Sequence, residues 1–399
     1  MKKFVALTVV IVLLFTAIVG CGIDKPIKIP SRPAVQAVNP PANGAETDTA
    51  EAVKHPDYEK MYALYTPDTV VMTVDGRDVT WGEYFSWYYT NAKQVENYMQ
   101  SMAMYGYPVN WDDMANSSAS YASYVTVSTE GTIKQMQTIE GYAASNGIEL
   151  GEESKAAIEE QIQSDIVTVC GEGATMDDLY AYLESVYMPV ETYNRISSLG
   201  AYQMELVSAL YGENNSKLSD KEVLEYLNDN GYMSAHHILF LTTGNENGEE
   251  LTEEELAAKQ AQAEAVYAEL AAIENTDERL KRFGELKQEL CEDTGKTMYP
   301  DGYTFTTGQM VSEFENAVLS LDEYEVSEPV RSSFGYHIIM RLPLDTDALI
   351  MTSTGEAATG RSLYASSDFN SRLQGYMDAM EMEYANGFEG VNILDYLSE

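Results

Sequence analysis

Three of the chain's four histidines lie at the two ends of one segment of about 100 residues. His236 and His237 begin the apolar run His-His-Ile-Leu-Phe, and His337 begins a second run, His-Ile-Ile-Met. Each run has the aliphatic and β-branched composition of a short strand. If the two strands pair, imidazoles from distant parts of the sequence meet against an apolar sheet. Buried titratable groups are costly in a plain core, so this arrangement indicates a functional site.

The residues between the two strands alternate helical and extended patterns. Thr252 and Glu255 have the spacing of a capping box, and an apolar stripe at helical spacing follows them. A second helix is predicted at 280–290, a short strand at 303–305 and a short helix at 313–321. This order, β-α-α-β-α-β-β, predicts a small antiparallel sheet covered by helices.

Four stretches of this segment resemble the parvulin family of peptidyl-prolyl isomerases over residues 232–343. They are the opening His-His-Ile-Leu, the run 308–317 (Gly-Gln-Met-Val-Ser-Glu-Phe-Glu-Asn-Ala), the run 327–330 (Ser-Glu-Pro-Val) and the run 334–339 (Phe-Gly-Tyr-His-Ile-Ile). The resemblance implies a small isomerase domain that rotates X–Pro peptide bonds. It implies no metal and no organic cofactor, because the reaction makes and breaks no bond to the substrate in its simplest form.

The resemblance also implies the site residues. In parvulins two histidines are joined through hydrogen bonds beneath the site, beside a position held by Asp or Cys and a pocket for the proline ring. The matching positions are His237, Asp293 and His337 as catalytic residues, and Met310, Phe314 and Ser332 as substrate-binding residues. Taken alone, the i, i+4 spacing of Met310 and Phe314 favours core packing, and Asp293 alone indicates an ordinary loop residue after a helix; only the whole set of matches favours a site. We expect His236 to face the opposite side of its strand from His237, and we assign His55 no role.

Two departures from the family pattern bear on the efficiency of isomerisation. Many parvulins carry Gly-Gly-Asp-Leu-Gly before the central strand, whereas this chain has Tyr-Pro-Asp-Gly-Tyr at 299–303. An aliphatic pocket wall is therefore replaced, either by Gly302 or by a shifted Tyr303. Phe334 stands where many relatives have a small, polar or aromatic residue. A further alternative, Cys291 as a nucleophile with a histidine as base, lacks an evident third group to orient the base.

The N-terminus has the pattern of a targeting segment. A basic start is followed by an apolar run from Phe4 to Val19 and by Ile-Val-Gly-Cys at 18–21. This resembles a bacterial lipoprotein signal with its lipobox, which implies cleavage before Cys21 and lipid on that cysteine, a firm membrane anchor. The alternatives are an ordinary cleaved signal peptide or a short membrane helix, for which the run is near the lower limit of length.

The remaining chain is predicted to be an α+β protein in which the small parvulin-like sheet domain is inserted into a mainly helical, chaperone-like domain. A strand at 69–74, a helix from about 80 to 105 and a final helix at 361–384 bound the helical part. The strand-turn-helix, a linking helix at Asp220 and the lipobox resemble the extracytoplasmic foldase lipoproteins of the PrsA type. The predicted domains are a signal peptide (1–20), a disordered tether (21–55), the N-terminal part of the helical domain (56–231), the isomerase domain (232–343) and a C-terminal helix packing on the helical domain (345–399).

Composition narrows the class of partner. With 24 basic and 64 acidic residues the chain has a formal net charge of −40, so nucleic acid is excluded as a partner. A basic unfolded client would be attracted, although the charge is also consistent with solubility alone. The helical part is rich in Tyr and Met, which serve either as core or as an adaptable groove. A homodimer and a disulfide between Cys170 and Cys291 stay open, and no Cys/His spacing of a metal site occurs.

We interpret the chain as a lipid-anchored foldase on the extracytoplasmic face of the cell membrane. Its predicted work is cis–trans isomerisation of X–Pro bonds in unfolded or partly folded secreted polypeptides. The alternative is a holdase chaperone that uses the parvulin-like domain only as a binding scaffold, because fold alone does not guarantee activity. A solute-binding lipoprotein would need repeated parallel strands in two lobes, and the sequence lacks that pattern.

Overall fold

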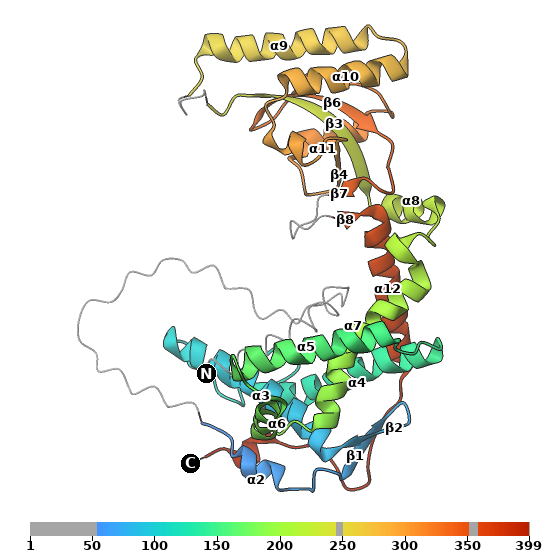
Figure 1. Cartoon of the computed structure of the whole chain (residues 1–399). Helices are drawn as coiled ribbons and strands as arrows, with labels where there is room; N and C mark the ends of the chain where they lie inside the picture. Colours follow the sequence, from blue (N-terminus) through green and yellow to red (C-terminus); the bar gives the residue numbers. More distant parts are fainter. Residues whose placement is uncertain (1–53, 245–249, 351–357, 399) are drawn as a thin grey trace, which may run out of the picture. The chain divides into compact units, whose positions relative to one another are not determined.

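The computed structural model describes residues 54–244, 250–350 and 358–398, which form two compact units (Figure 1). The first unit comprises the described residues up to Ala209 together with those from Phe369 onward, and the second comprises the described residues between Leu210 and Asp368. The predicted signal peptide, Cys21 and the tether up to residue 53 lie outside the described residues. Among the residues that the structure describes, no helix has the length and apolarity to cross a membrane.

The first unit is mainly helical and contains one three-stranded sheet of order β2-β1-β9. Thr80 ends β2 and caps the next helix, since its hydroxyl accepts a hydrogen bond from the Glu83 N–H. The elements are α2 (Tyr58–Tyr62), β1 (Val70–Val74), β2 (Arg77–Thr80), α3 (Trp81–Met104), α4 (Tyr121–Ser145), α5 (Glu152–Cys170), α6 (Met176–Ser185), α7 (Val190–Tyr211), the second half of α12 (Gly360–Ala379), β9 (Met382–Tyr384) and the 3₁₀ turn η3 (Ile393–Tyr396).

The final helix is shorter than the sequence pattern predicted. The prediction ran to residue 384, but α12 ends at Ala379, and Met382–Tyr384 form β9. This strand pairs antiparallel with β1, with Thr73 opposite Glu383. Without β9, this edge of β1 would leave its N–H and C=O groups unpaired. Pairing between distant segments has no helical periodicity, so the sequence pattern could not predict it.

The second unit is an α+β fold around a six-stranded sheet of order β5-β6-β3-β4-β7-β8. All neighbouring pairs are antiparallel except β4 and β7, which are parallel. The predicted order of elements is confirmed, and β7 and β8 are additions to it. The elements are η1 (Glu213–Asn215), α8 (Asp220–Asp229), β3 (Tyr232–Leu241), α9 (Glu253–Ala271), α10 (Thr276–Leu290), η2 (Thr294–Thr297), β4 (Tyr303–Thr306), α11 (Ser312–Ser320), β5 (Val330–Arg331), β6 (Gly335–Leu342), β7 (Leu349–Ile350) and β8 (Ala358–Thr359).

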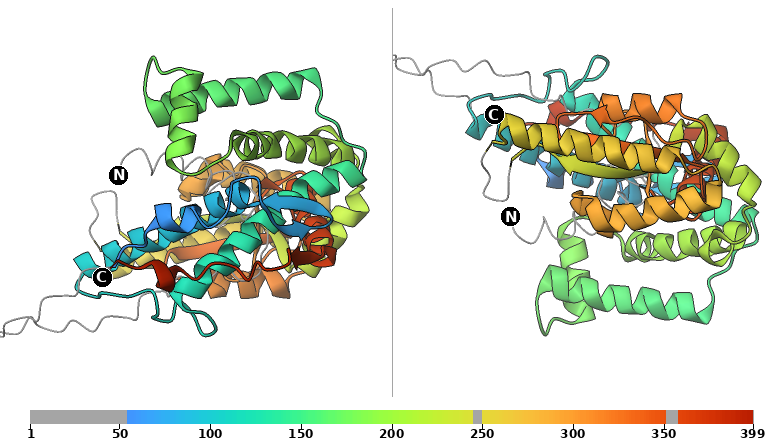
Figure 2. Two further views of the ribbon diagram at one scale, coloured as in Figure 1. Left: turned by 90° about the horizontal axis from the view of Figure 1, so that it is seen from below. Right: turned by 90° about the horizontal axis from the view of Figure 1, so that it is seen from above.

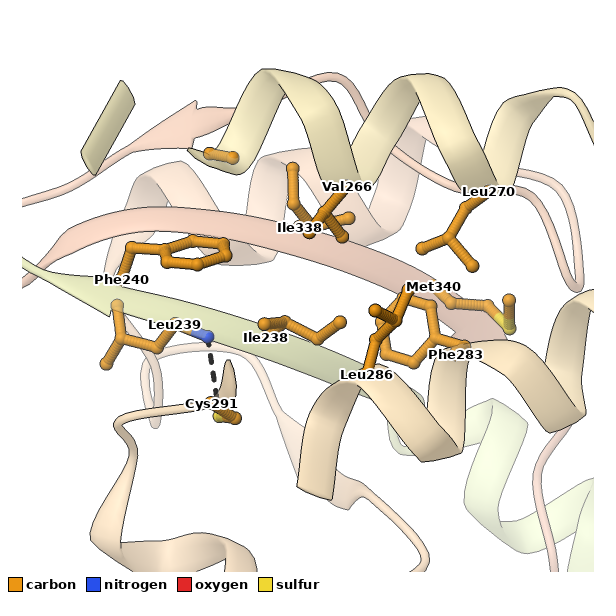
Figure 3. Packing of buried hydrophobic residues seen from close by; sticks show 11 residues of the cluster. Ile238, Leu239, Phe240, Val266, Leu270, Phe283, Leu286, Cys291, Ile338 and Met340 are labelled. Carbon is orange, nitrogen blue, oxygen red and sulfur yellow. Dashed lines mark hydrogen bonds between the residues drawn. The ribbon is translucent and has the colours of Figure 1, made fainter. Parts of the chain in front are cut away.

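Helices cover both faces of this sheet. The longer helices α9 and α10 lie side by side on one face, as the view from above shows, and α11 packs on the other (Figures 1 and 2). Figure 3 draws the buried cluster that includes the core beneath α9 and α10; its labelled residues are Ile238, Leu239, Phe240, Val266, Leu270, Phe283, Leu286, Cys291, Ile338 and Met340. The core beneath α11 contains Met233, Ala235, Tyr303, Phe305, Phe314 and Ile339 among its buried residues.

The register of β3 and β6 decides which face each histidine takes. His237 lies opposite Ile339 and His337 lies opposite Leu239, so the two histidines are diagonal neighbours on the α11 face. His236 points to the other face, where its ring stacks on Phe283 with centroids 5.9 Å apart. The predicted opposition of His236 and His237 is confirmed, because successive strand residues alternate between the two faces.

Candidate active site

The two histidines form a buried, directly bonded pair. The Nδ1 atoms of His237 and His337 are 3.2 Å apart, and the ring centroids are 5.4 Å apart. His237 is 7% exposed and His337 is 3% exposed. Residues separated by a hundred positions in sequence therefore meet, as the strand pattern predicted.

Asp293 completes the pair from the loop after α10. Its Oδ2 atom accepts hydrogen bonds from His237 Nε2 (2.9 Å) and from the Tyr303 hydroxyl (2.6 Å). Its Oδ1 atom accepts from the Gly295 N–H (2.9 Å), which caps η2. Burial raises the pKa of this carboxyl, but the three donors outweigh burial and hold its pKa well below the usual range. Asp293 is therefore an anion at neutral pH.

Ser332 completes the network at its other end. The Ser332 hydroxyl lies 2.7 Å from His337 Nε2 and accepts a hydrogen bond from the Phe334 N–H (3.1 Å). Burial, reinforced by the neighbouring His237, lowers the pKa of His337 to about 3. His337 is therefore neutral at neutral pH, so it donates through one ring nitrogen and accepts through the other.

One direction of hydrogen bonding around the neutral His337 satisfies every member of the network. The carboxylate of Asp293 accepts from His237 Nε2–H, which leaves His237 Nδ1 as an acceptor for His337 Nδ1–H. His337 Nε2 then accepts from the Ser332 hydroxyl, which in turn accepts from the Phe334 N–H. A buried polar network with no unsatisfied member is rigid, which suits a site that must keep its shape.

A cavity of about 460 Å³ lies over this network. Met310 and Phe314 supply apolar walls, and the Phe314 ring stands edge-on to His237 with centroids 5.3 Å apart. Glu315 holds the loop before α11, since its carboxylate accepts from the N–H groups of Gly308 (2.8 Å) and Met310 (2.9 Å). The cavity is lined by His237, Leu239, Asp293, Tyr303, Gln309, Met310, Val311, Phe314, Phe334 and His337.

The structure thus brings together the six predicted site residues of this unit, five lining the cavity and Ser332 bonded to His337. Tyr303, one of the two residues that the sequence offered as a replacement for the pocket wall, lines the cavity, and its hydrogen bond to Asp293 was not expected. The sequence signal for Tyr303 was its position in the stretch 299–303, which differs from the family pattern. Leu239 had another signal, since it lies two positions after His237 and shares its face.

Cys291 does not have the environment of a nucleophile. It is 4% exposed, burial raises the pKa of its thiol, and the sulfur accepts from the Leu239 N–H at 3.4 Å. A reactive cysteine needs a lowered pKa and access to solvent. No disulfide joins Cys170 and Cys291 within the described part of the chain.

Comparison with known proteins agrees with this geometry. Residues 237–342 match the family model of the rotamase, or PPIC-type PPIase, domain. The chain is 55% identical over 60 residues to foldase protein PrsA 1 of Bacillus cereus (15% of this chain, 21% of the relative). It is 26% identical over 222 residues to foldase protein PrsA of Oceanobacillus iheyensis (55% and 61%). The chain thus spans about a fifth to three fifths of the length of these curated relatives.

Among solved structures, PrsA from Bacillus subtilis matches with 18% identity, covering 78% of this chain and 91% of that one, at a TM-score of 0.23. NmPin, the parvulin of Nitrosopumilus maritimus, matches with 32% identity over 28% of this chain and 96% of that one, at a TM-score of 0.20. The sequence matches, and not these low scores, identify residues 237–342 as a parvulin-type peptidyl-prolyl isomerase domain and make the chain a relative of the PrsA foldases.

Proposed function

We propose that this chain is a membrane-anchored extracytoplasmic foldase that catalyses cis–trans isomerisation of X–Pro bonds in secreted polypeptides. The observation that carries the proposal is the Asp293–His237–His337 network beneath a cavity walled by Met310 and Phe314. It combines an apolar hold for a proline ring with a fixed polar floor, in a segment that matches an isomerase family.

Isomerisation of an X–Pro bond requires stabilisation of a twisted amide and involves no covalent step. Rotation about an X–Pro bond meets a barrier near that of amides in general, about 18–20 kcal/mol, and takes tens of seconds or longer uncatalysed. Twisting removes amide resonance, so the transition state is less polar than either planar form. An apolar, water-poor cavity therefore favours the twisted form over the planar ones, which is the differential binding that catalysis requires.

The polar floor supplies a field that does not rearrange during the reaction. Asp293 carries a negative charge that its three donors hold in place, and His337 stays neutral because its pKa is about 3. Groups that are already oriented need no reorganisation as charge leaves the carbonyl oxygen of the substrate. We propose that His237 and His337 hold the hydrogen-bond network in a fixed geometry. Met310 and Phe314 would hold the proline ring.

A proline-limited refolding assay tests the proposal. The wild-type chain should accelerate the slow phase of a protein whose refolding waits for X–Pro isomerisation. Asp293→Ala and His337→Ala should each lose most of that acceleration while remaining folded by circular dichroism. A wild-type chain that leaves the slow phase unchanged would rule out the enzyme.

The anchor is a separate part of the proposal and rests on the sequence at Cys21. We propose that lipid on this cysteine holds the acidic body at the outer face of the membrane. Expression in a bacterial host with labelled palmitate should label the wild-type chain, and Cys21→Ser should abolish the label. Labelling of Cys21→Ser equal to that of the wild type would contradict the anchor.

A holdase activity is the second candidate, and one observation favours it. The end of α3 and the segment after it expose Met104 (84%), Tyr105 (72%), Tyr107 (61%) and Met114 (61%) in the first unit. Grouped apolar side chains in solvent are typical of interaction surfaces. If the holdase alone accounts for function, His337→Ala suppresses aggregation of an unfolding client as well as the wild type does, and neither changes the slow refolding phase.

A further inference from the structure

A buried lysine that the isomerase chemistry does not use lies behind the site. Lys287 is on α10 and is 2% exposed. Its Nζ atom contacts three acceptors: the carbonyl oxygens of Pro300 (2.9 Å) and Tyr299 (3.1 Å) and the Nδ1 atom of His236 (3.3 Å). An ammonium group has three donors, so this group is fully satisfied although it is removed from water.

Two of the three acceptors belong to the turn that departs from the family pattern. The Gly302 N–H donates to the Tyr299 carbonyl at 3.2 Å, which closes the turn 299–302. Gly302 has φ +105°, and a Cβ atom there would lie 2.8 Å from the carbonyl oxygen of Ala235 in β3. The turn is therefore pressed against β3 by glycine geometry on one side and tied to α10 by the lysine on the other.

The residue that leaves this turn is Tyr303, which reaches across to the opposite face. Tyr303 pairs with Ala235 in the sheet, and its ring contacts the Tyr299 ring with centroids 4.8 Å apart. Its hydroxyl donates to Asp293 at 2.6 Å. Gly295 leaves the room that the phenol occupies, since a Cβ atom on that glycine would overlap the Tyr303 hydroxyl.

We propose that Lys287 is a positioning residue of the isomerase site, which fixes the turn 299–302 and thereby holds the Tyr303 hydroxyl on Asp293. The inference rests on the proposed isomerase function for its effect on rate, but its structural part stands on the contacts alone. The lysine acts from the face of the sheet opposite to the cavity, and Tyr303, the residue after the turn, transmits its effect. A hydroxyl that lies directly on Asp293 needs such support, because a loosely held phenol would leave the carboxylate with two donors in place of three.

A double-mutant cycle separates this role from general stabilisation. Tyr303→Phe keeps the ring and removes only the hydroxyl, and Lys287→Met keeps the length of the side chain and removes the ammonium. Each single variant should lower kcat/KM for a proline-containing peptide by about two- to tenfold, the range that one hydrogen bond supports. If Lys287 acts through Tyr303, the double variant is no slower than the slower single variant, within about twofold.

The matched control is Lys281→Met, the same substitution at an exposed position of α10. It should leave kcat/KM unchanged. Effects of Lys287→Met and Tyr303→Phe that multiply in the double variant overturn the proposal, and so does an unchanged kcat/KM in Lys287→Met. If Lys287→Met does not fold, Lys287→Gln takes its place in the cycle, since an amide keeps two donors and should show a smaller loss with the same non-additivity.

A second readout judges the inference without isomerase activity. In protein labelled at the tyrosine Cζ carbon, the Tyr303 resonance is assigned by its absence in Tyr303→Phe. This resonance should move in Lys287→Met, or in Lys287→Gln, and not in Lys281→Met. An unmoved resonance overturns the positioning role. A wild-type chain that is inactive on every peptide would sink the proposed function alone and leave the positioning role to be decided by the resonance.

Discussion

His236 and His237 are neighbours on one strand and belong to two different environments. His236 faces α10, where it stacks on Phe283 and accepts from the Lys287 ammonium. Burial, reinforced by the neighbouring Lys287 and His237, lowers the pKa of His236 to about 4. His237 faces the cavity, where it bonds His337 and Asp293. One position along a strand is enough to separate a structural imidazole from one in the site.

The difference between the two faces is how completely helices cover them. The 19 residues of α9 and the 15 of α10 lie over one face and bury its apolar residues in a closed core. Of the described helices, the 9-residue α11 packs on the other face, and the cavity opens beside it. Both faces hold buried titratable groups, so burial alone does not mark the site. The cavity does, together with a network of polar groups that extends to its surface.

The largest expected effect is a loss of isomerase activity on substitution of His237 that substitution of His236 does not cause. We expect His237→Ala to lower the acceleration of a proline-limited refolding phase by roughly a hundredfold, as for removal of a preorganised polar group. His236→Ala should lose less than about threefold, the effect of one hydrogen bond at a distance. The measurement is kcat/KM of each variant at equal folded concentration. Equal losses in the two variants would remove the distinction between the faces.

Acidification should destabilise the second unit through His337. The unfolded chain has an ordinary histidine pKa near 6.5, whereas the folded pKa of His337 is about 3. Below pH 6.5 the unfolded state binds a proton that the folded state rejects, so the free energy of unfolding falls as the pH falls. One such histidine accounts for about 2 kcal/mol between pH 7 and pH 5. Asp293 adds nothing in that window, because its lowered pKa makes its contribution disappear only below about pH 4.

The check on this prediction is a set of urea titrations of the full chain at pH 7 and pH 5, followed by amide signals of β3 and β6. His337→Gln removes the titrating group and should flatten the pH dependence by about the amount given. His236→Gln should also flatten the pH dependence, because the pKa of His236 is likewise lowered in the folded chain. A slope that neither substitution changes would contradict the pKa values of both histidines.

A matched pair of phenylalanines compares the two cores. Phe314 on α11 is 2% exposed and Phe283 on α10 is 0% exposed. Phe314→Leu and Phe283→Leu should each lower the free energy of unfolding by about 1–2 kcal/mol, as for other losses of buried volume. Only Phe314→Leu should also raise KM for a proline-containing peptide, because only that ring lines the cavity. A raised KM in Phe283→Leu of the same size would show that KM reports core packing in general.

Periodicity in the sequence was enough to predict most of the difference between the two faces of the sheet. The two-residue repeat of a strand was enough to place His236 and His237 on opposite faces, and capping signals placed the start of α9 at Thr252. The match to known motifs then singled out Met310 and Phe314, whose spacing alone reads as core.

Sequence reasoning failed where a contact depends on the detailed path of the backbone. The Tyr303 hydroxyl reaches Asp293 only because Gly295 leaves space and Gly302 allows a tight turn, and neither condition has a periodic signature. β7 and β8 have two residues each, too short for a pattern to emerge. β9 was mistaken for the end of α12 because its pairing with β1 joins residues far apart in the sequence.

The smallest expected effect concerns Cys291, which lies on the closed face although it is two residues from Asp293. Its sulfur accepts from the Leu239 N–H and donates to the His237 carbonyl at 3.7 Å, so it ties the loop after α10 to β3. Cys291→Ala should cost about 1 kcal/mol of stability, as for loss of a small buried group and a weak hydrogen bond. Isomerase activity should stay within about twofold of the wild type, because burial raises the thiol pKa and leaves no thiolate at neutral pH.

The measurements are kcat/KM and the rate of alkylation by iodoacetamide in the folded chain at pH 7. Rapid alkylation, or a loss of activity beyond tenfold, would move Cys291 from the closed core to the working face of the sheet.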